Sequence, residues 1–477
     1  MARTVVVVGA GCAGTLTAVN LLRRPGGALR VVLVERSGRF GPGVAYATAD
    51  PGHLLNVAAE RMSAFPDEPG HFAAWASRRL GPLPEGAYLP RGLYGDYLRD
   101  LLADAARDAT PRGRVLERVA GEVVDVVPRA TGGGALAGGA AGGGVAGGAP
   151  AGAADGSGGA VVRLADGRAL TADAVVLALG ALPANAPIAL PDDPRVVGDP
   201  WAPGALDGAP PAATTLLVGA GLTAVDVALG CCARDERNRV VAISRGGCLP
   251  YDQLPGLRPP VAVRTPPPAA PATVARLERW LAVHVARARR GGADWRDALD
   301  GVRPHVQALW RSLPHEEQCR FVRERSRAWE LRRHRMAPEV GARVRELVSG
   351  GRLLVRAGRV LAVRALPRTV ELLVDDCGEL RTLRGDRVVV CAGTGTDVRG
   401  AAGRVPLLGA LLRRGLAVPD RHGLGLRATG EGALVARGGD ADPRLRLLGP
   451  LRRGELWETT AVGEIRVQAQ AVAAALG

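Results

Sequence analysis

The stretch that decides the fold lies near the N-terminus and reads Thr4-Val-Val-Val-Val-Gly9-Ala-Gly11-Cys-Ala-Gly14. The apolar run predicts a buried parallel strand that enters a glycine turn and continues as a helix. Gly9 permits the tight turn, Gly11 lets the backbone approach a pyrophosphate, and Gly14 lets helix and strand pack closely. Because the first N–H groups of a helix have no partner within it, they would bind the phosphates.

An acidic residue follows this turn at the spacing that a dinucleotide site requires. A second strand predicted over residues 30–34 ends at Glu35, 21 residues beyond Gly14. A carboxylate at that place accepts a hydrogen bond from a ribose hydroxyl. A glycine triplet alone is weak evidence, but the triplet between strand and helix with the acid at this distance predicts a site for FAD.

The same pattern occurs a second time, 210 positions further along the chain. Thr214-Thr-Leu-Leu-Val-Gly219-Ala-Gly221-Leu-Thr-Ala224 aligns with the first motif, and alanine is an accepted third residue. The second strand of this copy, residues 239–244, ends at Ser244 and is followed by Arg245, the counterpart of Glu35. An arginine there suits the 2′-phosphate of NADPH. The alternative is chance, because arginine supplies 62 of the 477 residues.

The composition limits the classes of function. All 62 basic residues are arginine and none is lysine, which excludes Schiff-base chemistry and a lysine-dependent phosphate loop. The net charge of +15 therefore reflects a bias of the whole chain, and we expect a small-molecule substrate and no nucleic-acid or membrane partner. The sequence begins with a strand and has no charged leader, so we expect a cytoplasmic protein. Its seven cysteines and seven histidines show neither a Cys-x-x-Cys pair nor a zinc spacing, so no metal site is expected.

The expected fold is α/β, with two Rossmann-like dinucleotide-binding domains and an inserted helical segment. Residues 1–198 and 400–477 would form the FAD-binding domain, 199–260 and 351–399 the NAD(P)H-binding domain, and 261–350 the helical insert, in which four tryptophans are read as core anchors. Strands are expected at 353–363, 370–374 and 387–391. The almost pure Gly/Ala stretch 131–159 predicts a flexible loop at the tip of a hairpin formed by runs 121–127 and 160–164.

Three further segments complete this architecture. Apolar strands end in glycine at 175–180 and 388–393, where the chain would cross between the domains. Near the C-terminus, Gly449 and then Thr459 and Thr460 precede a helix that continues to Leu476. The positive end of that helix would stabilise negative charge on reduced flavin. A purely structural C-terminal helix is the alternative.

With these residues in view, the chain resembles the FAD/NAD(P)-binding protein family related to flavin-dependent N-hydroxylating monooxygenases. The resemblance covers nearly the whole chain and is most specific in the loop from Leu54 to Phe72. It also rests on these segments: 9–14, 41–46, 219–226, 329–338 and 456–460. It implies hydride transfer from NADPH to FAD and then delivery to oxygen or another acceptor. Some relatives oxidise amino groups.

The loop in this resemblance supplies the candidates for contact with flavin and substrate. They are His53, Asn56, Met62, Ser63, Asp67 and His71. The competing interpretation is a structural loop whose polar side chains bond their own backbone. His334 could act as an acid or base, although a helical histidine without a role is the simpler reading. Arg61 or Arg91 could hold an acidic substrate, and Asp226 would complement the start of its helix. A monooxygenase, a reductase or dehydrogenase without oxygen activation, and a non-catalytic flavin-binding subunit all stay open.

Overall fold

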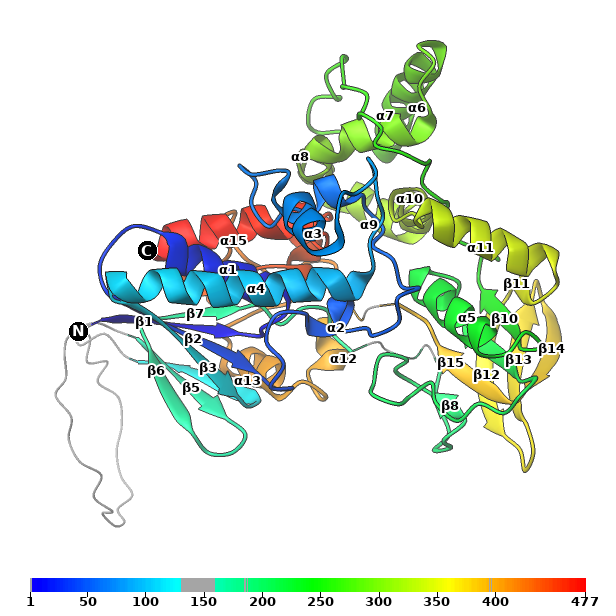
Figure 1. Cartoon of the computed structure of the whole chain (residues 1–477), viewed down its shortest axis with the longest axis horizontal. Helices are drawn as coiled ribbons and strands as arrows, with labels where there is room; N and C mark the ends of the chain where they lie inside the picture. The colour runs from blue at the N-terminus through cyan, green and yellow to red at the C-terminus, as the bar shows by residue number, and fades with distance from the viewer. Residues whose placement is uncertain (1, 130–158, 184–185, 187, 394, 396) are drawn as a thin grey trace.

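The computed structural model describes residues 2–129, 159–183, 186, 188–393, 395 and 397–477 (Figure 1). The predicted Gly/Ala loop covers residues 131–159, and only Gly159 of this loop belongs to the described part of the chain. The strands on either side of it, β4 (Val123–Pro128) and β5 (Ala160–Leu164), pair antiparallel with Pro128 opposite Ala160. The predicted pairing of the two flanking runs is therefore confirmed.

The first domain is built on a six-stranded sheet with the order β16-β17-β7-β1-β2-β3. Its strands are β1 (Arg3–Val8), β2 (Leu29–Glu35), β3 (Arg114–Ala120), β7 (Ala174–Leu177), β16 (Ala433–Val435) and β17 (Ala441–Leu447). The central strand β1 is parallel to both of its neighbours, β2 and β7. Val5 and Val7 point into one core and Val6 and Val8 into another, so both faces are covered. This accounts for a strand that is apolar without alternation.

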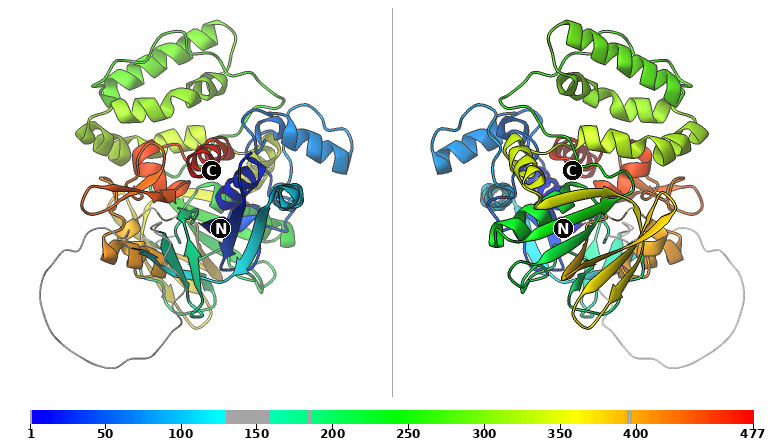
Figure 2. Two further views of the ribbon diagram at one scale, coloured as in Figure 1. Left: turned by 90° about the vertical axis from the view of Figure 1, so that its left-hand side faces the viewer. Right: turned by 90° about the vertical axis from the view of Figure 1, so that its right-hand side faces the viewer.

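Helices pack on one face of this sheet and a second small sheet packs on the other (Figures 1 and 2). The first core lies under α1 (Cys12–Arg23), α4 (Arg91–Ala109) and α15 (Val462–Leu476). The second core lies under the antiparallel strands β4, β5 and β6 (Ala169–Ala172) and under α13 (Pro406–Arg414). Shorter helices complete the domain: α2 (Gly43–Tyr46), α3 (His71–Leu80), α12 (Val398–Ala401) and α14 (Arg453–Leu456).

The second domain repeats this plan on a five-stranded parallel sheet with the order β11-β10-β9-β15-β8. Its strands are β8 (Val196–Val197), β9 (Thr214–Val218), β10 (Arg239–Ser244), β11 (Leu353–Ala357) and β15 (Arg387–Val390). Helices α5 (Leu222–Arg234) and α11 (Pro338–Ser349) cover one face, and the antiparallel sheet β12 (Arg359–Ala365), β13 (Val370–Asp376) and β14 (Glu379–Gly385) covers the other.

Three details of the sequence prediction need correction. The run 353–363 is two strands in different sheets, because Gly358 turns the chain with a φ of +151°. The proposed insert 261–350 includes α11, yet Val340 and Val344 of α11 share a core with α5. The strand β8 precedes the boundary drawn at residue 198 but pairs with β15 of the second sheet. The packing agrees better with an insert that ends with α10 and with a second domain that begins before β8 than with the predicted boundaries.

The helical insert stands above both sheets (Figures 1 and 2). It comprises α6 (Val274–Arg290), α7 (Trp295–Val302), α8 (Val306–Ser312), α9 (His315–Glu324) and α10 (Ser326–Arg333). Trp280 and Trp310 are buried in its core, as expected of anchors. Trp329 is half-buried and packs against the same core, whereas Trp295 is half-buried outside it, so the expectation is wrong for Trp295.

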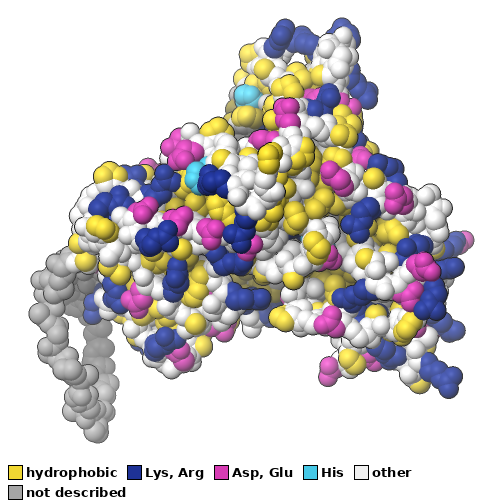
Figure 3. Space-filling view, in the orientation of Figure 1, with side chains coloured by type: hydrophobic (Ala, Val, Ile, Leu, Met, Phe, Trp, Pro, Cys, Tyr) yellow, Lys and Arg dark blue, Asp and Glu magenta, His cyan; other side chains and the backbone are white. Residues whose placement is uncertain are grey.

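Arginines do not gather into one basic face on the side of the molecule in Figure 3, where they are interspersed with acidic side chains over both domains and the insert. Among the described helices, none combines the length and the apolar character needed to cross a membrane.

Candidate functional site

The first glycine turn has the geometry of a dinucleotide cradle. Gly9 adopts a φ of +96°, and a Cβ added there would lie 2.4 Å from the carbonyl oxygen of Ala178. A Cβ on Gly14 would lie 1.8 Å from the carbonyl oxygen of Gly9. A side chain at either position would therefore push strand and helix apart. Gly11 is the N-cap residue of α1 and provides no capping side chain, and no acidic residue lies in the first turn, so N–H groups are left for an anion.

The carboxylate of Glu35 lies beside this turn. Its Oε2 accepts a hydrogen bond of 2.9 Å from the backbone N–H of Ala10, between the first two glycines. Its Oε1 accepts bonds from the backbone and the hydroxyl of Ser37. The side chain is half-exposed, so lone pairs can still accept a bond from a ligand hydroxyl. Its role toward a ribose stays a prediction.

The second glycine turn reproduces the first. Gly219 has a φ of +120°, and an added Cβ would meet the carbonyl oxygen of Cys391 at 2.3 Å. Gly221 is the N-cap residue of α5 and provides no capping side chain, and a Cβ there would meet no atom within 4 Å, which leaves the backbone open to a ligand. Ala224 is buried in the place of Gly14. The steric demands of a nucleotide-binding turn are therefore met twice.

Arg245 lies just beyond β10, at the carboxyl edge of the second sheet. Ser244 ends the strand, and its carbonyl oxygen accepts bonds from the N–H groups of Gly247 and Gly358. The Arg245 side chain is exposed, and within the described part of the chain its guanidinium has no hydrogen-bond partner. It is free to contact a phosphate, although its preference for one stays a prediction.

The insert contributes a basic residue at this turn that the sequence did not single out. The guanidinium of Arg327 in α10 donates a bond of 3.3 Å to the carbonyl oxygen of Ala220, between Gly219 and Gly221. The two residues are 107 positions apart, so no local motif could have placed Arg327 there.

Two polar side chains of the loop Leu54–Phe72 are held by neighbouring groups, Ser63 within the loop itself and His71 by helix α4. The buried Ser63 hydroxyl donates to the carbonyl oxygens of Phe65 and Glu68 and accepts from the N–H of Phe65. His71 bonds the Tyr97 hydroxyl at 2.8 Å, and burial lowers the pKa of His71 below its ordinary value. These contacts favour the structural interpretation of this part of the loop.

The other loop candidates lie apart from one another. Asp67 is exposed, and His53 is buried with its Nδ1 2.8 Å from the Thr48 hydroxyl. Met62 is buried in the first core. Asn56 is half-buried, and its carbonyl oxygen accepts a bond of 3.5 Å from Gln253 in the second domain. Of these candidates, only Asn56 has a hydrogen bond that reaches the boundary between the domains.

The arginines considered as substrate ligands are occupied by carboxylates. Arg91 forms a bidentate pair with Asp226, with N–O distances of 2.6 and 3.2 Å. Asp226 therefore bridges from α5 to α4 of the first domain, which corrects the expectation that it mainly complements the start of its own helix. Arg61 donates to the carbonyl oxygen of Arg258 and lies 3.7 Å from Asp300.

In the C-terminal segment, a hydrogen-bond network joins Gly449, which follows β17, to Thr459 and helix α15. The fully buried Thr459 donates its hydroxyl to the carbonyl oxygen of Gly449 at 2.9 Å. Gln468 donates to the Thr459 hydroxyl and accepts from the N–H of Gly449, which closes the network. Thr459 is thus committed to holding the backbone, whereas Thr460 is exposed at the uncapped N-terminus of α15.

A buried ion pair, not anticipated from the sequence, lies next to Thr459. The Glu458 carboxylate is 4% exposed and accepts a bond of 3.1 Å from the Trp329 indole, with Arg333 3.6 Å away. Burial alone would raise the pKa of Glu458, but the charges of Arg333 and His334, followed by the Trp329 bond, hold it below its usual range. The segments 329–338 and 456–460, which both carry the family resemblance, are therefore in contact.

The backbone beside Glu458 is strained. Trp457 has a φ of +60° and a ψ of −64°, and the N–H of Glu458 donates across it to the carbonyl oxygen of Leu456 at 2.7 Å. This three-residue turn is uncommon for a bulky residue and costs about 1–3 kcal/mol. This strained turn occurs where the Trp457 ring packs against Trp310 and Phe321 of the insert, with ring centroids 5.0 Å apart in each case.

His334 follows α10 directly and faces the same cluster. Its side chain is half-buried, and burial lowers its pKa, with Arg333 adding to the effect while Glu458 opposes it. The imidazole is consequently neutral near pH 7 and able to accept a proton. The residue is partly exposed, as the simpler reading of the sequence assumed, but it lies directly after the helix and not within it.

Comparisons with known proteins agree with this architecture. Residues 6–146 match a family model described as FAD-NAD(P)-binding. No curated protein matches the sequence. Among solved structures, the chain is similar to the reduced form of an ornithine hydroxylase from Pseudomonas aeruginosa, with a TM-score of 0.62, 18% identity, and coverage of 100% of this chain and 99% of that one.

Two further structures show the same likeness. An ornithine N-hydroxylase from Kutzneria sp. 744, described with reduced FAD, NADP+ and L-ornithine, gives a TM-score of 0.57 at 18% identity, with 99% and 98% of the two chains covered. An L-lysine 6-monooxygenase from Pseudomonas syringae gives 0.58 at 15% identity, also with 99% and 98% covered. At these identities the likeness establishes the fold, that of flavoproteins with two dinucleotide-binding domains, as predicted from the two glycine motifs.

Proposed function

We propose that the protein is an FAD-dependent oxidoreductase that uses NADPH and acts as a monooxygenase on a small molecule. The observation that carries this proposal is the repetition of one uncapped glycine turn at the carboxyl edges of two parallel sheets. One copy is followed by the acid Glu35 and the other by the base Arg245. Two nucleotide sites with opposite side-chain charge fit two different dinucleotides.

The first domain fits FAD. The turn Gly9–Gly14 leaves room for a pyrophosphate where any side chain would clash, and Glu35 stands ready to accept from a ribose hydroxyl. We place the flavin toward Thr460 and the N-terminus of α15, whose partial positive charge favours an electron-rich ring. Asn56 and Met62 are the loop residues that we propose for contact with it. Bound FAD would supply hydride acceptance and oxygen chemistry, which no side chain here provides.

The second domain fits NADPH. Arg245 would clamp the 2′-phosphate, and the N-terminus of α5 would hold the pyrophosphate. Arg327 already lies at this turn through its bond to Ala220, so its charge would favour the same phosphates. The insert would thus contribute one basic residue, Arg327, to the second nucleotide site.

Within the oxidoreductases, the structure disfavours disulfide reduction. All seven cysteines are free, and the adjacent pair Cys231 and Cys232 is buried in α5, where burial raises the pKa of both thiols. A buried thiol with a raised pKa is a poor nucleophile. The likeness to structures of ornithine and lysine hydroxylases supports an amine as the group that is oxidised.

For proton transfer we propose His334, because it is neutral and borders the turn that leads to Thr460. Ser63 is not carried into the proposal, since the loop backbone uses its hydroxyl, and neither is the exposed Asp67. We expect the protein to act in the cytoplasm on a freely diffusing substrate.

The test is a two-stage reaction. The purified protein is reduced with NADPH without oxygen, and oxygen is then admitted with a panel of amines that includes ornithine and lysine. A monooxygenase forms hydroxylated product in proportion to the NADPH consumed. Flavin reduction followed only by hydrogen peroxide, whatever amine is offered, replaces the proposal with a reductase or dehydrogenase. Absence of flavin reduction by NADPH points to a non-catalytic flavin-binding subunit.

A further inference from the structure

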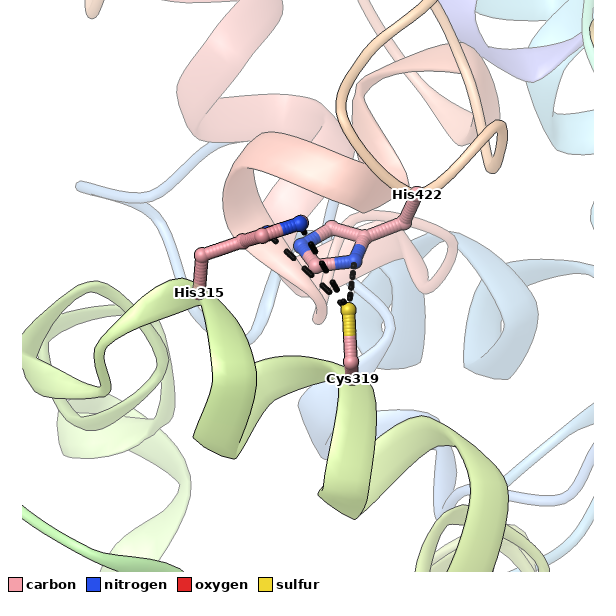
Figure 4. A group of neighbouring side chains, drawn as sticks. All are labelled: His315, Cys319 and His422. Atoms are coloured by element: carbon pink, nitrogen blue, oxygen red, sulfur yellow. Dashed lines mark hydrogen bonds between the residues drawn. The ribbon is translucent and has the colours of Figure 1, made fainter.

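Three side chains with metal-binding chemistry converge at the junction of the insert and the first domain (Figure 4). His315 and Cys319 are four residues apart on α9, so they lie on the same face of the helix. His422 approaches from the segment between α13 and β16. One ligand atom from each residue lies within 4.8 Å of the others.

The distances suit a single tetrahedral ion. Zinc binds a thiolate at about 2.3 Å and an imidazole at about 2.0–2.1 Å, so tetrahedral angles place sulfur and nitrogen about 3.6 Å apart. The Sγ of Cys319 lies 3.6 Å from the Nε2 of His315 and 3.8 Å from the Nδ1 of His422. Little movement is needed to close the three ligands around one ion.

A second residue fixes the orientation of one ligand. The Nε2 of His422 lies 2.9 Å from the Oε1 of Gln318, whose amide nitrogen donates to the carbonyl oxygen of Trp310 at 2.9 Å. Because the Gln318 amide is held in this way, its oxygen accepts a hydrogen bond from the Nε2–H of His422, which leaves the Nδ1 lone pair directed at Cys319. Ligating histidines typically have such a partner on their other nitrogen.

We propose that His315, Cys319 and His422 form a zinc site, independent of the flavin chemistry. One thiolate and two imidazoles are ligands that favour zinc over magnesium or calcium. Three protein ligands leave a fourth position for water or an anion. An open cavity of about 340 Å³ adjoins the site, and Arg311, Arg421 and Arg427 line it together with Asp420 and Glu455. The three arginines favour an anionic fourth ligand.

The site would join two parts of the chain that are remote in sequence. Cys319 and His422 are 103 positions apart, which is why the spacing of cysteines and histidines gave no zinc motif. Since the ligands come from the insert and from the first domain, the bound ion would fasten one to the other. Trp310 lies against His422 and also against Trp457, with centroid distances of 5.3 and 5.0 Å, so this fastening would support the strained turn at Trp457.

The experiment measures zinc in the holoprotein. Protein without an affinity tag is dialysed against zinc and then against buffer, and metal and FAD are quantified together. The wild type should retain stoichiometric zinc and show a higher unfolding temperature with zinc than after chelation. Cys319→Ser and His422→Ala should retain FAD but lose stoichiometric zinc. Cys377→Ser is the matched control, because Cys377 is an exposed cysteine in the turn between β13 and β14, and this variant should bind zinc as the wild type does.

A substitution beyond the ligands tests the built site against casual binding. Gln318→Ala should weaken zinc binding by roughly 10- to 100-fold in competition with a chromophoric chelator, and Gln318→Glu should restore it, because a carboxylate also accepts from imidazole. The proposal is overturned if the wild type keeps no zinc, if Cys319→Ser keeps as much as the wild type, or if Gln318→Ala leaves the affinity unchanged. None of these outcomes depends on flavin reduction.

Discussion

The ion pair between Arg91 and Asp226 should hold the two dinucleotide-binding domains together, and its removal should be costly. Arg91 begins α4 in the first domain and Asp226 lies on α5 in the second. Their side chains are 15% and 5% exposed, and the guanidinium also donates to the carbonyl oxygen of Leu54 at 2.9 Å. The substitution to make is Arg91→Met, which keeps the aliphatic stem and removes the charge.

The expected loss of stability in Arg91→Met follows from the burial of the ion pair and the distance between its charges. Unit charges about 4 Å apart attract by about 4 kcal/mol at an effective dielectric constant of about 20. The cost of removing both charges from water offsets much of this attraction, but loss of Arg91 alone would leave the Asp226 carboxylate buried without a partner. Such a change costs about 3–5 kcal/mol. For a cooperative unit of about 150–250 residues this corresponds to a fall of roughly 6–20 °C in unfolding temperature.

Thermal unfolding is monitored by far-ultraviolet circular dichroism and by the fluorescence of the flavin that is released. Arg30→Met is the matched control, since Arg30 pairs with Glu117 on the surface and its loss should cost no more than about 1 kcal/mol. The double variant Arg91→Met/Asp226→Leu should recover part of the loss, because it leaves no unpaired charge. If Arg91→Met melts within 2 °C of Arg30→Met, the reasoning about burial is refuted.

The remaining predictions concern the cofactors, the hairpin and the ion pair of Glu458. Arg245→Ala should weaken NADPH by about 5- to 150-fold with NADH nearly unchanged, and Arg245→Glu should favour NADH; equal weakening of both cofactors in flavin-reduction assays would reduce Arg245 to one more surface arginine. Gly14→Val should yield protein without flavin, because its Cβ would lie 1.8 Å from the carbonyl oxygen of Gly9. The control Gly27→Val, whose Cβ would have no atom within 4 Å, should stay yellow. A yellow Gly14→Val protein would contradict the role of this turn in binding FAD. Replacing residues 131–159 by a short turn should leave FAD bound, because the free energy of loop closure changes slowly with length, and a colourless product would show that the segment packs against the domain. Glu458→Gln should unfold at a lower temperature than the wild type at pH 7, and the two unfolding temperatures should converge on acidification. A carboxylate whose pKa lies below its ordinary 4.5 contributes stability above that value and loses it as pH falls through the lowered pKa. A difference in unfolding temperature that is constant with pH would mean that the charge of Glu458 contributes nothing.

The parts of the fold that could be predicted are those that a few neighbouring residues determine. Gly9 and Gly14 are required because a Cβ would collide with backbone within the same strand–turn–helix unit, and that requirement is readable in the spacing of the glycines. The run Val5–Val8 predicted a strand covered on both faces, and the structure has one core on each side of it. Local rules were sufficient for both.

The parts that could not be predicted depend on contacts between distant residues. Helicity alone assigned α11 to the insert, because amphipathic helices look alike whether they pack on a sheet or on other helices. Asp226 looked like a helix-start acid because its partner, Arg91, is 135 positions away. Ser63 and Asp67 have polar side chains suited to catalysis, and only the folded structure shows that Ser63 is bonded to its own loop and that Asp67 faces solvent.

These long-range contacts also constrain how the second domain can move. Domains joined by a small polar interface commonly reorient, and a flavoprotein that must admit NADPH to the flavin needs such freedom. Here the insert contacts the second glycine turn through Arg327 and Glu458 through Trp329 and Arg333, all within α10. A rotation of the second domain that left α10 on Glu458 would break several contacts: the partly buried bond from Arg327 to Ala220, the backbone bond from Tyr251 to Leu331 in α10, and the buried Arg91–Asp226 pair. The buried contacts with Glu458 would remain. Because the insert is bonded to both domains, these contacts should oppose such a rotation, and binding of NADPH phosphates near Arg327 would draw the second domain further toward the insert.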